Sequence, residues 1–406
     1  MSVSLSESLH PAADPGWSDI PAPSALRYTE RFSEAFLDSL RSKGDPLADA
    51  VIAELAETMP LTDVGDLLAE VRRRVGTSPA CAAFIKAGVR LPAWVDFEAM
   101  RAGQRLIAQF PLHMGLGLFS GSLVGGAVFP KMALVTAMTG MLSGDTNKRL
   151  DETAAMVLRM SMPGTLEPGG EAHELFVRVR LLHGALRRFL PETGRFRHPT
   201  EVPINQQDLA ITLGLFGYVN VRSLARMNIH LTEEERASFT LLWRYAGFVL
   251  GIDDALLPHT AEEQREFFLA SLKHQARPDK LSDKNRIVMD NFARQVHRTL
   301  PPVSETVMRD LLYQICRYLS GDDYVTGMNL PNPGDDYWGL RLLRGLGSAA
   351  HFIHRKVPGG EDALYRFGVV HYQRSLRLME HKKDKQGTYR VRTTQDAFPT
   401  APAPVA

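Results

Sequence analysis

The stretch that decides the fold reads Phe176-Val177-Arg178-Val179-Arg180-Leu181-Leu182-His183-Gly184-Ala185-Leu186-Arg187-Arg188. Its apolar residues recur at spacings of three and four, which is the period of an α-helix. The pattern therefore predicts a helix with one imidazole in an apolar strip, an arginine one turn before it and another one turn after it. On such a helix His183 shares a face with Phe176, Val179, Arg180, Leu186, Arg187 and Leu190.

This helix face offers the groups that a haem requires. An imidazole nitrogen ligates iron, apolar side chains contact the macrocycle, and Arg180 and Arg187 are suited to pair with two propionates. We therefore interpret His183 as a candidate axial ligand of haem iron. The alternative is a core histidine on an ordinary amphipathic helix, because single histidines on helices are common.

The composition is that of a globular protein with a large core. The chain has 406 residues, of which 44% are hydrophobic and 23% are charged. Lys and Arg number 47 against 46 Asp and Glu, so no global charge attracts nucleic acid, and we expect no nucleic-acid partner. Cys81 and Cys316 match no metal-binding spacing and no disulfide-rich secreted pattern.

The N-terminal residues contain neither a basic segment nor the apolar segment of an export signal, which predicts a cytoplasmic protein. An apolar stretch rich in glycine and serine covers residues 115–129. It is shorter than the roughly 20 residues that a membrane span needs, so we expect no span. A buried pair of helices is the interpretation we favour, and a peripheral membrane contact is the alternative.

Almost every other segment has helical periodicity, which predicts an all-α fold. We expect a flexible arm over residues 1–22, one large helical domain over 23–381 and a flexible tail over 382–406. Residues 389–392 show the one short alternation typical of a strand. The expected helices cover residues 29–42, 46–59, 61–75, 96–107, 146–160, 173–190, 206–227, 232–250, 261–274, 283–294, 303–320, 337–352 and 362–380.

The helix expected over 146–160 is a candidate for the opposite face of the haem. Arg149, Glu152 and Thr153 fall on one side of it. A cation, a carboxylate and a hydroxyl grouped in this way would bind and polarise dioxygen or hydrogen peroxide. A buried carboxylate would also move protons, because burial and a neighbouring cation tune its pKa. The alternative is a solvated face with an ion pair between Arg149 and Glu152.

Six stretches, in their order and spacing, resemble the latex clearing protein family, the rubber oxygenases, and a broader set of related oxygenases. The resemblance covers roughly residues 28–380. The stretches are Gly44-Asp45-Pro46-Leu47-Ala48-Asp49, Leu91-Pro92-Ala93-Trp94-Val95-Asp96, Arg149-Leu150-Asp151-Glu152-Thr153, Val179-Arg180-Leu181-Leu182-His183-Gly184-Ala185-Leu186-Arg187, Gln207-Asp208-Leu209-Ala210, and Leu242-Trp243-Arg244-Tyr245-Ala246-Gly247-Phe248-Val249-Leu250-Gly251-Ile252.

The resemblance implies a globin-like helical core with additional helices and a b-type haem. The family's axial histidine matches His183, and Arg180 matches a second family position. Arg149 and Thr153 match an arginine and a threonine on the opposing helix. Rubber-cleaving members use dioxygen to cut a polyisoprene double bond into carbonyl ends, and a fungal relative in mycophenolic acid biosynthesis cuts a prenyl side chain. The resemblance thus implies oxidation of an apolar, prenyl-type substrate.

Two positions differ from the family pattern. Glu152 stands where the rubber cleavers have a lysine, and their catalytic glutamate would fall near Ala133. These differences favour a small apolar substrate over rubber, with an oxygenase or peroxygenase activity. Glu152 would exchange protons with the oxidant, Arg149 would orient Glu152 or stabilise negative charge, and Thr153 would donate a hydrogen bond to the oxidant. The rival function is a non-catalytic helical carrier of haem or lipid.

Overall fold

The computed structural model describes residues 17–59, 61, 66–138, 146–192, 194, 196–278, 289–290, 293–294, 304–325, 327, 330 and 338–386. For residues 136–138, 146–152 and 380–386 it describes the backbone alone. Every regular element in these ranges is a helix, which confirms the all-α prediction.

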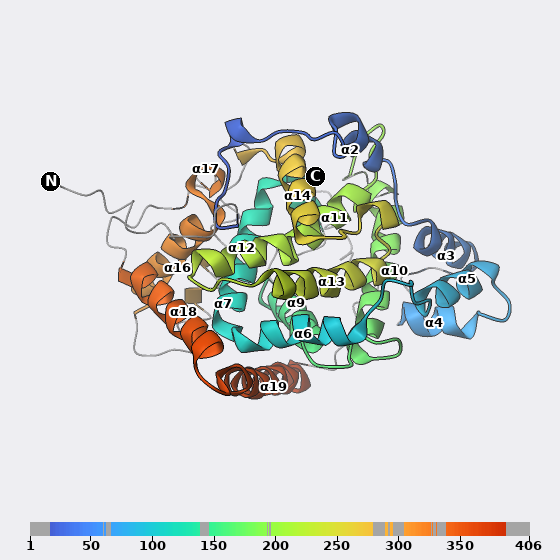
Figure 1. Cartoon of the computed structure of the whole chain (residues 1–406). Coiled ribbons are helices and arrows are strands. Elements are labelled where there is room, and N and C mark those ends of the chain that lie inside the picture. The colour runs from blue at the N-terminus through green and yellow to red at the C-terminus, as the bar shows by residue number, and fades with distance from the viewer. Residues whose placement is uncertain are drawn as a thin grey trace.

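The helices of the first half are η1 (Pro23–Ala25), α2 (Glu34–Leu40), α3 (Pro46–Thr58), α4 (Leu67–Arg73), α5 (Pro79–Gly88), α6 (Phe97–Gln109), α7 (Pro111–Leu116), η3 (Gly117–Val124), η4 (Gly125–Val128), α8 (Pro130–Met138), α9 (Thr146–Met160) and α10 (Glu171–Glu192). Those of the second half are α11 (Gln206–Phe216), α12 (Tyr218–Arg226), α13 (Glu233–Val249), η5 (Asp254–Leu256), α14 (Ala261–Gln275), α16 (Glu305–Ser320), α17 (Asp322–Val325), α18 (Trp338–Lys356) and α19 (Gly360–Gln386) (Figure 1).

Side-chain caps define where many of these helices begin. Asp45 accepts hydrogen bonds from the backbone N–H groups of Leu47 and Ala48, and Pro46 occupies the first position of α3. This is the start that the Gly44-Asp45-Pro46 sequence predicts. Thr232 and Glu235 form a reciprocal capping box at the start of α13. Local sequence therefore sets the helix boundaries around the site with little help from distant contacts.

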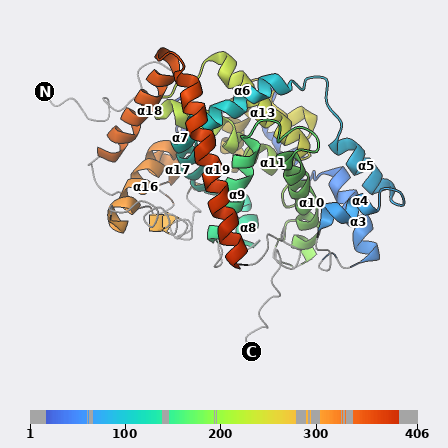
Figure 2. The same ribbon diagram turned by 90° about the horizontal axis from the view of Figure 1, so that it is seen from below.

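Helix α6 lies between α13 and α19, and it packs closely on both. Gly103 allows the approach of α13, because a Cβ there would stand 2.6 Å from the carbonyl oxygen of Ser238. Gly368 allows the approach of α19, because a Cβ there would overlap the carbonyl oxygen of Ala108. The Tyr372 hydroxyl also donates a hydrogen bond to Ile107 O at 2.8 Å. Figure 2 shows α19 lying across the outside of the body.

The apolar stretch at residues 115–129 belongs to a helical run made of α7, η3 and η4. The central element η3 is a π-helix, a form that occurs often at functional sites. Phe119, Val124 and Val128 are buried, as expected, and the run packs against α12 and α16. By length and composition Pro111–Val128 would suffice to cross a membrane, and 56% of it is buried inside the protein.

Several segments differ from the expectations. The helix expected over 206–227 is broken into α11 and α12 at Gly217, where a Cβ would overlap the side chain of Gln264. Periodicity continues through this break because both helices are buried. In addition, the short helix α5 has no counterpart among the expected helices.

The packed body begins earlier than residue 23. Trp17, which we expected in the flexible arm, is buried against Tyr218 and beneath the guanidinium of Arg236. Ser18 O also accepts a hydrogen bond from Arg226. The burial of this one tryptophan therefore attaches to the body a segment whose proline- and serine-rich composition predicts a flexible arm. Most of the helix expected over 283–294 and the strand expected over 389–392 lie outside the described residues.

Replacing Gly368 by Ala should destabilise the protein by about 1–3 kcal/mol, because the added methyl group pushes α19 away from α6. The matched control is Gly345→Ala in α18, where nothing lies within 4 Å of the new Cβ. That control should stabilise the helix by about 0.5–1 kcal/mol. Denaturant unfolding of both variants measures the difference, and equal stabilities would contradict the close contact.

Candidate functional site

Helices α9 and α10 pack against each other, as the interpretation of a two-sided site requires. The observed bounds of α9 are those predicted. Arg149 and Glu152 lie on it, but their side chains lie outside the described residues. Thr153 is exposed, whereas Val157, one turn later, and Met160 are buried. The side of α9 that carries Thr153 is therefore open at Thr153 and closed one turn later at Val157.

His183 lies in the middle of α10 and is half-buried. One turn further along this helix, Leu186 and then Leu190 belong to an apolar cluster that is separate from the main core. Val135 of α8 and Phe196 complete this small cluster. The imidazole thus stands beside an apolar surface contributed by α8, α10 and the loop after α10.

Arg180 is fixed by an ion pair with Asp45. Its Nε and Nη2 atoms donate hydrogen bonds to the two carboxylate oxygens at 2.5 and 2.9 Å, and both side chains are buried. The guanidinium also lies over the ring of Phe84, 5.3 Å from the centroid. Gly251, at φ +82°, closes over this pair, since a Cβ there would overlap both partners. The role of Arg180 as a propionate partner stays a prediction.

Arg187 makes a corresponding ion pair with Asp49, which lies one turn after Asp45 along α3. Its Nε donates to Asp49 Oδ1 at 2.7 Å, and Nη1 donates to Ile204 O at 3.2 Å. Burial raises the pKa of the Asp49 carboxyl group, against the effect of the neighbouring guanidinium. Among the described residues, the buried Nη2 of Arg187 has no hydrogen-bond partner. One donor of this arginine is therefore left for a ligand oxygen.

These residues fit a haem. They supply an imidazole, an apolar surface and a buried guanidinium donor suited to a carboxylate. Three or more His, Cys, Asp or Glu side chains do not come together anywhere in the described ranges to hold a metal ion by themselves. Ala133, where the family's glutamate was expected, is half-buried on α8. The predicted roles of His183 and Arg187 stay predictions.

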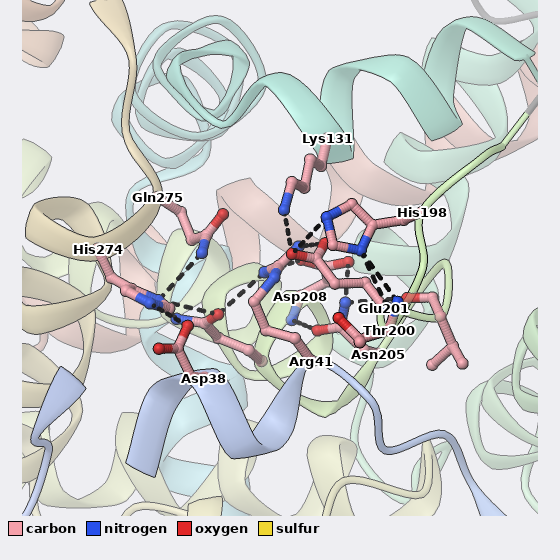
Figure 3. Close-up of polar contacts among 12 residues, drawn as sticks. Asp38, Arg41, Lys131, His198, Thr200, Glu201, Asn205, Asp208, His274 and Gln275 are labelled. Carbon is pink, nitrogen blue, oxygen red and sulfur yellow. Dashed lines mark hydrogen bonds and ion pairs between the residues drawn. The ribbon is translucent and has the colours of Figure 1, made fainter. Parts of the chain in front are cut away.

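Figure 3 shows a polar network that includes Arg41, Lys131, Glu201 and Asp208. At its centre Arg41, the residue that caps the end of α2, donates to Glu201 Oε2 at 2.7 Å, to Gln207 Oε1 at 2.9 Å and to Asp208 Oδ1 at 3.4 Å. Lys131 of α8 makes a second ion pair with Glu201. The network therefore joins α2, α8, α11 and the loop that precedes α11.

The network shifts the pKa values of its two carboxyl groups in opposite directions. Burial acts to raise the pKa of Glu201, but hydrogen bonds from Arg41 and Lys131 lower it to about 2. Burial raises the pKa of Asp208 to about 6, although Arg41 opposes the change. The arginine is thus shared between one strongly acidic carboxylate and one that titrates near neutral pH.

The network reaches the α3–α10 contact through Gln206. Its side-chain amide donates to Gly44 O at 2.8 Å and to Gly251 O at 3.0 Å, the two glycines that flank the ion pairs of α10. We did not identify this network from the sequence. The sequence feature that could have revealed the network is the polar pair Gln207-Asp208 within an otherwise apolar helix. The same pair lies in one of the stretches that resemble the family.

Replacing Glu201 by Gln should destabilise the protein by about 3 kcal/mol at pH 7, since Arg41 and Lys131 lose their shared carboxylate. Glu201 has a lowered pKa in the folded protein, so its stabilising effect is present above about pH 4.5 and is lost as the pH falls toward 2. Chemical unfolding at several pH values should show a constant difference between wild type and variant above about pH 4.5, and convergence of the two as the pH falls below that value.

The control for this measurement is Glu174→Gln, which breaks an exposed pair with Arg72. Its cost should be no more than about 1 kcal/mol. A Glu201→Gln effect that is the same at every pH would contradict the assigned ion pairs.

Comparison with known proteins identifies the family. The family described as ER-bound oxygenase mpaB/B'/Rubber oxygenase, catalytic domain, matches residues 109–351, which include α9 and α10. The fold is similar to that of latex clearing protein in the closed state, with a TM-score of 0.57 and 17% identity over 89% of this chain and 95% of that chain. No curated protein sequence matches the chain. The chain belongs to the mpaB and rubber oxygenase family, as its sequence motifs predicted.

Proposed function

We propose that this member of an oxygenase family is a haem b-dependent enzyme that oxidises a small apolar, prenyl-type substrate. The observation that carries the proposal is the surface around His183. A half-buried imidazole there lies beside a separate apolar cluster and one turn from an arginine that has a buried donor to spare. In our proposal His183 holds the iron and Arg187 holds a propionate.

A haem bound on this surface would supply the redox centre that activates dioxygen or hydrogen peroxide. The chain's own contribution is to place groups on both sides of it. Arg180 and Asp45 keep α10 from turning, so the imidazole of His183 keeps its direction. The apolar cluster around Leu186 excludes water, which favours binding of an apolar substrate.

On α9, we propose that the carboxylate of Glu152 accepts a proton from hydrogen peroxide and gives it to the oxygen that leaves as water, while the bound haem would supply the redox chemistry of O–O cleavage. Arg149, one turn earlier, would hold that carboxylate in place or stabilise negative charge. The exposed Thr153 would donate a hydrogen bond to the oxidant. Glu152 in place of the lysine of rubber cleavers supports a small substrate rather than the polymer.

His183→Ala should abolish haem binding, because the proposed iron ligand is removed. The purified variant, expressed with adequate haem supply, should lack the Soret band of the wild type. His173→Gln is the matched control, since His173 is a second, buried histidine of α10 whose ring contacts Gly88 O at 2.9 Å. It should retain full haem content.

A colourless wild-type protein would contradict the haem proposal and favour a lipid carrier. A coloured wild type in which both histidine variants keep the Soret band would place the iron ligand elsewhere. A coloured protein without activity toward dioxygen, peroxide and prenyl compounds would favour the haem carrier.

Glu152→Gln should lower turnover by about 100-fold or more while leaving the haem content intact, because a general acid–base group contributes a factor of this size. Steady-state oxidation of prenyl compounds, with dioxygen and with peroxide, measures the effect. Glu192→Gln, at the exposed end of α10, is the control and should turn over normally. Unchanged turnover in Glu152→Gln would reject its role.

A further inference from the structure

Exposed apolar side chains gather on the last two described helices. Fourteen large hydrophobic residues are exposed in the described part of the chain, and eight of them lie between Trp338 and Leu378. The other six are spread over the rest of the chain. Scattered exposed apolar residues are normal, but such a concentration marks a binding surface.

On α18 the exposed residues form a stripe along the helix. Trp338, Leu342 and Leu346 follow one another at spacings of four, and 43%, 55% and 46% of each is exposed. The opposite side of α18 is buried, and Gly347 there packs directly on the backbone of Met227. The stripe therefore points away from the body. The packing of Gly347 on the body fixes this orientation of α18.

On α19 the same arrangement recurs. Phe367 and Val370 are each 65% exposed and Leu378 is 57% exposed, at spacings that place them on one side of the helix. The opposite side carries Gly368 and Tyr372, which are packed against α6. Figure 2 shows α18 and α19 on the outside of the body, one following the other.

These two helices carry a strong excess of positive charge. Residues 338–379 contain seven Lys and Arg residues but only two acidic residues, Glu361 and Asp362, although the whole chain has a net charge of only +1. Asp362 is paired with Arg105 of α6. The exposed residues Arg366 and Arg377 lie at the edge of the apolar side of α19, and the exposed Arg374 lies within it. Apolar residues flanked by arginine are typical of helices that lie at a membrane interface.

A cavity of about 680 Å³ with a mixed polar and apolar lining opens beside the stripe of α18. Phe352 and Lys356, exposed on the same helix, contribute to its lining together with Ser348 and His351. The buried Nδ1 of His351 has no hydrogen-bond partner among the described residues. A lipid phosphate placed here would meet a cation and a hydroxyl while its acyl chains follow the apolar stripe.

We propose that α18 and α19 form a surface that binds an anionic phospholipid bilayer. A second copy of the chain fits this surface less well, because a two-fold dimer would bring the same excess of positive charge face to face. The bilayer supplies both an apolar interior and negative headgroups. This inference goes beyond the proposed oxygenase activity and does not require a haem.

Co-sedimentation of the full chain with vesicles tests the proposal. Binding should be strong to vesicles of phosphatidylcholine and phosphatidylserine, weak to phosphatidylcholine alone, and should weaken as salt is added. Two double variants, Leu342→Gln/Leu346→Gln and Phe367→Gln/Val370→Gln, should each lower the partition coefficient by about tenfold or more. All four positions are exposed, so thermal unfolding should be unchanged.

The control is Val89→Gln/Leu91→Gln, which removes two equally exposed apolar residues at the end of α5 and should bind vesicles as the wild type does. Absence of binding to the anionic vesicles would overturn the proposal. So would equal losses in the control and the test variants, or a dimer in solution that the Phe367→Gln/Val370→Gln variant dissociates. Soret absorbance is recorded in parallel, so failure of the haem proposal remains distinguishable from failure of this one.

Discussion

Two ion pairs between α3 and α10 determine how the candidate site is built. Arg180 pairs with Asp45 and Arg187 pairs with Asp49, so two carboxylates one turn apart on α3 hold two arginines two turns apart on α10. His183 lies between these arginines. The Arg180–Asp45 pair is buried, and removing one partner of such a pair typically costs about 3–5 kcal/mol, so α10 cannot rotate without losing stability. The Asp49 carboxylate is 38% exposed, so the second pair contributes less. The direction of the imidazole therefore follows from contacts that the imidazole itself does not make.

The ion pairs depend in turn on the backbone around them. Gly44 and Gly251 approach the charged groups so closely that a Cβ at either position would overlap a carboxylate oxygen. The side chain of Gln206 donates to the carbonyl oxygens of both glycines and thereby brings the loop before α11 to the same place. The polar network around Arg41 and Glu201 anchors that loop to α2 and α8. Stability and site geometry thus share one set of buried charges.

The sequence predicted those features that local patterns encode. The bounds of α9 and the cap of α3 by Asp45 follow from periodicity and from capping chemistry, and the burial of much of the 115–129 stretch follows from its apolar composition. The second role of Asp45 could not be predicted, because its partner Arg180 lies 135 residues away and no local pattern links them. The break at Gly217 was hidden for a related reason, since a buried helix and a buried bend have the same hydrophobicity.

The two proposed surfaces meet at α19. This helix packs against α9, which carries Glu152 and Thr153, and its exposed side carries Phe367 and Val370. A prenyl-type substrate partitions into a bilayer because of its apolar surface, so a membrane on the outside of α19 would concentrate the substrate next to a helix that packs against α9. An enzyme with an exposed apolar stripe needs no separate carrier for such a substrate. The positive charge of α18 and α19 would then strengthen association with the membrane, whereas the charges around α10 fix the geometry of the candidate site. The two sets of arginines therefore have separate roles.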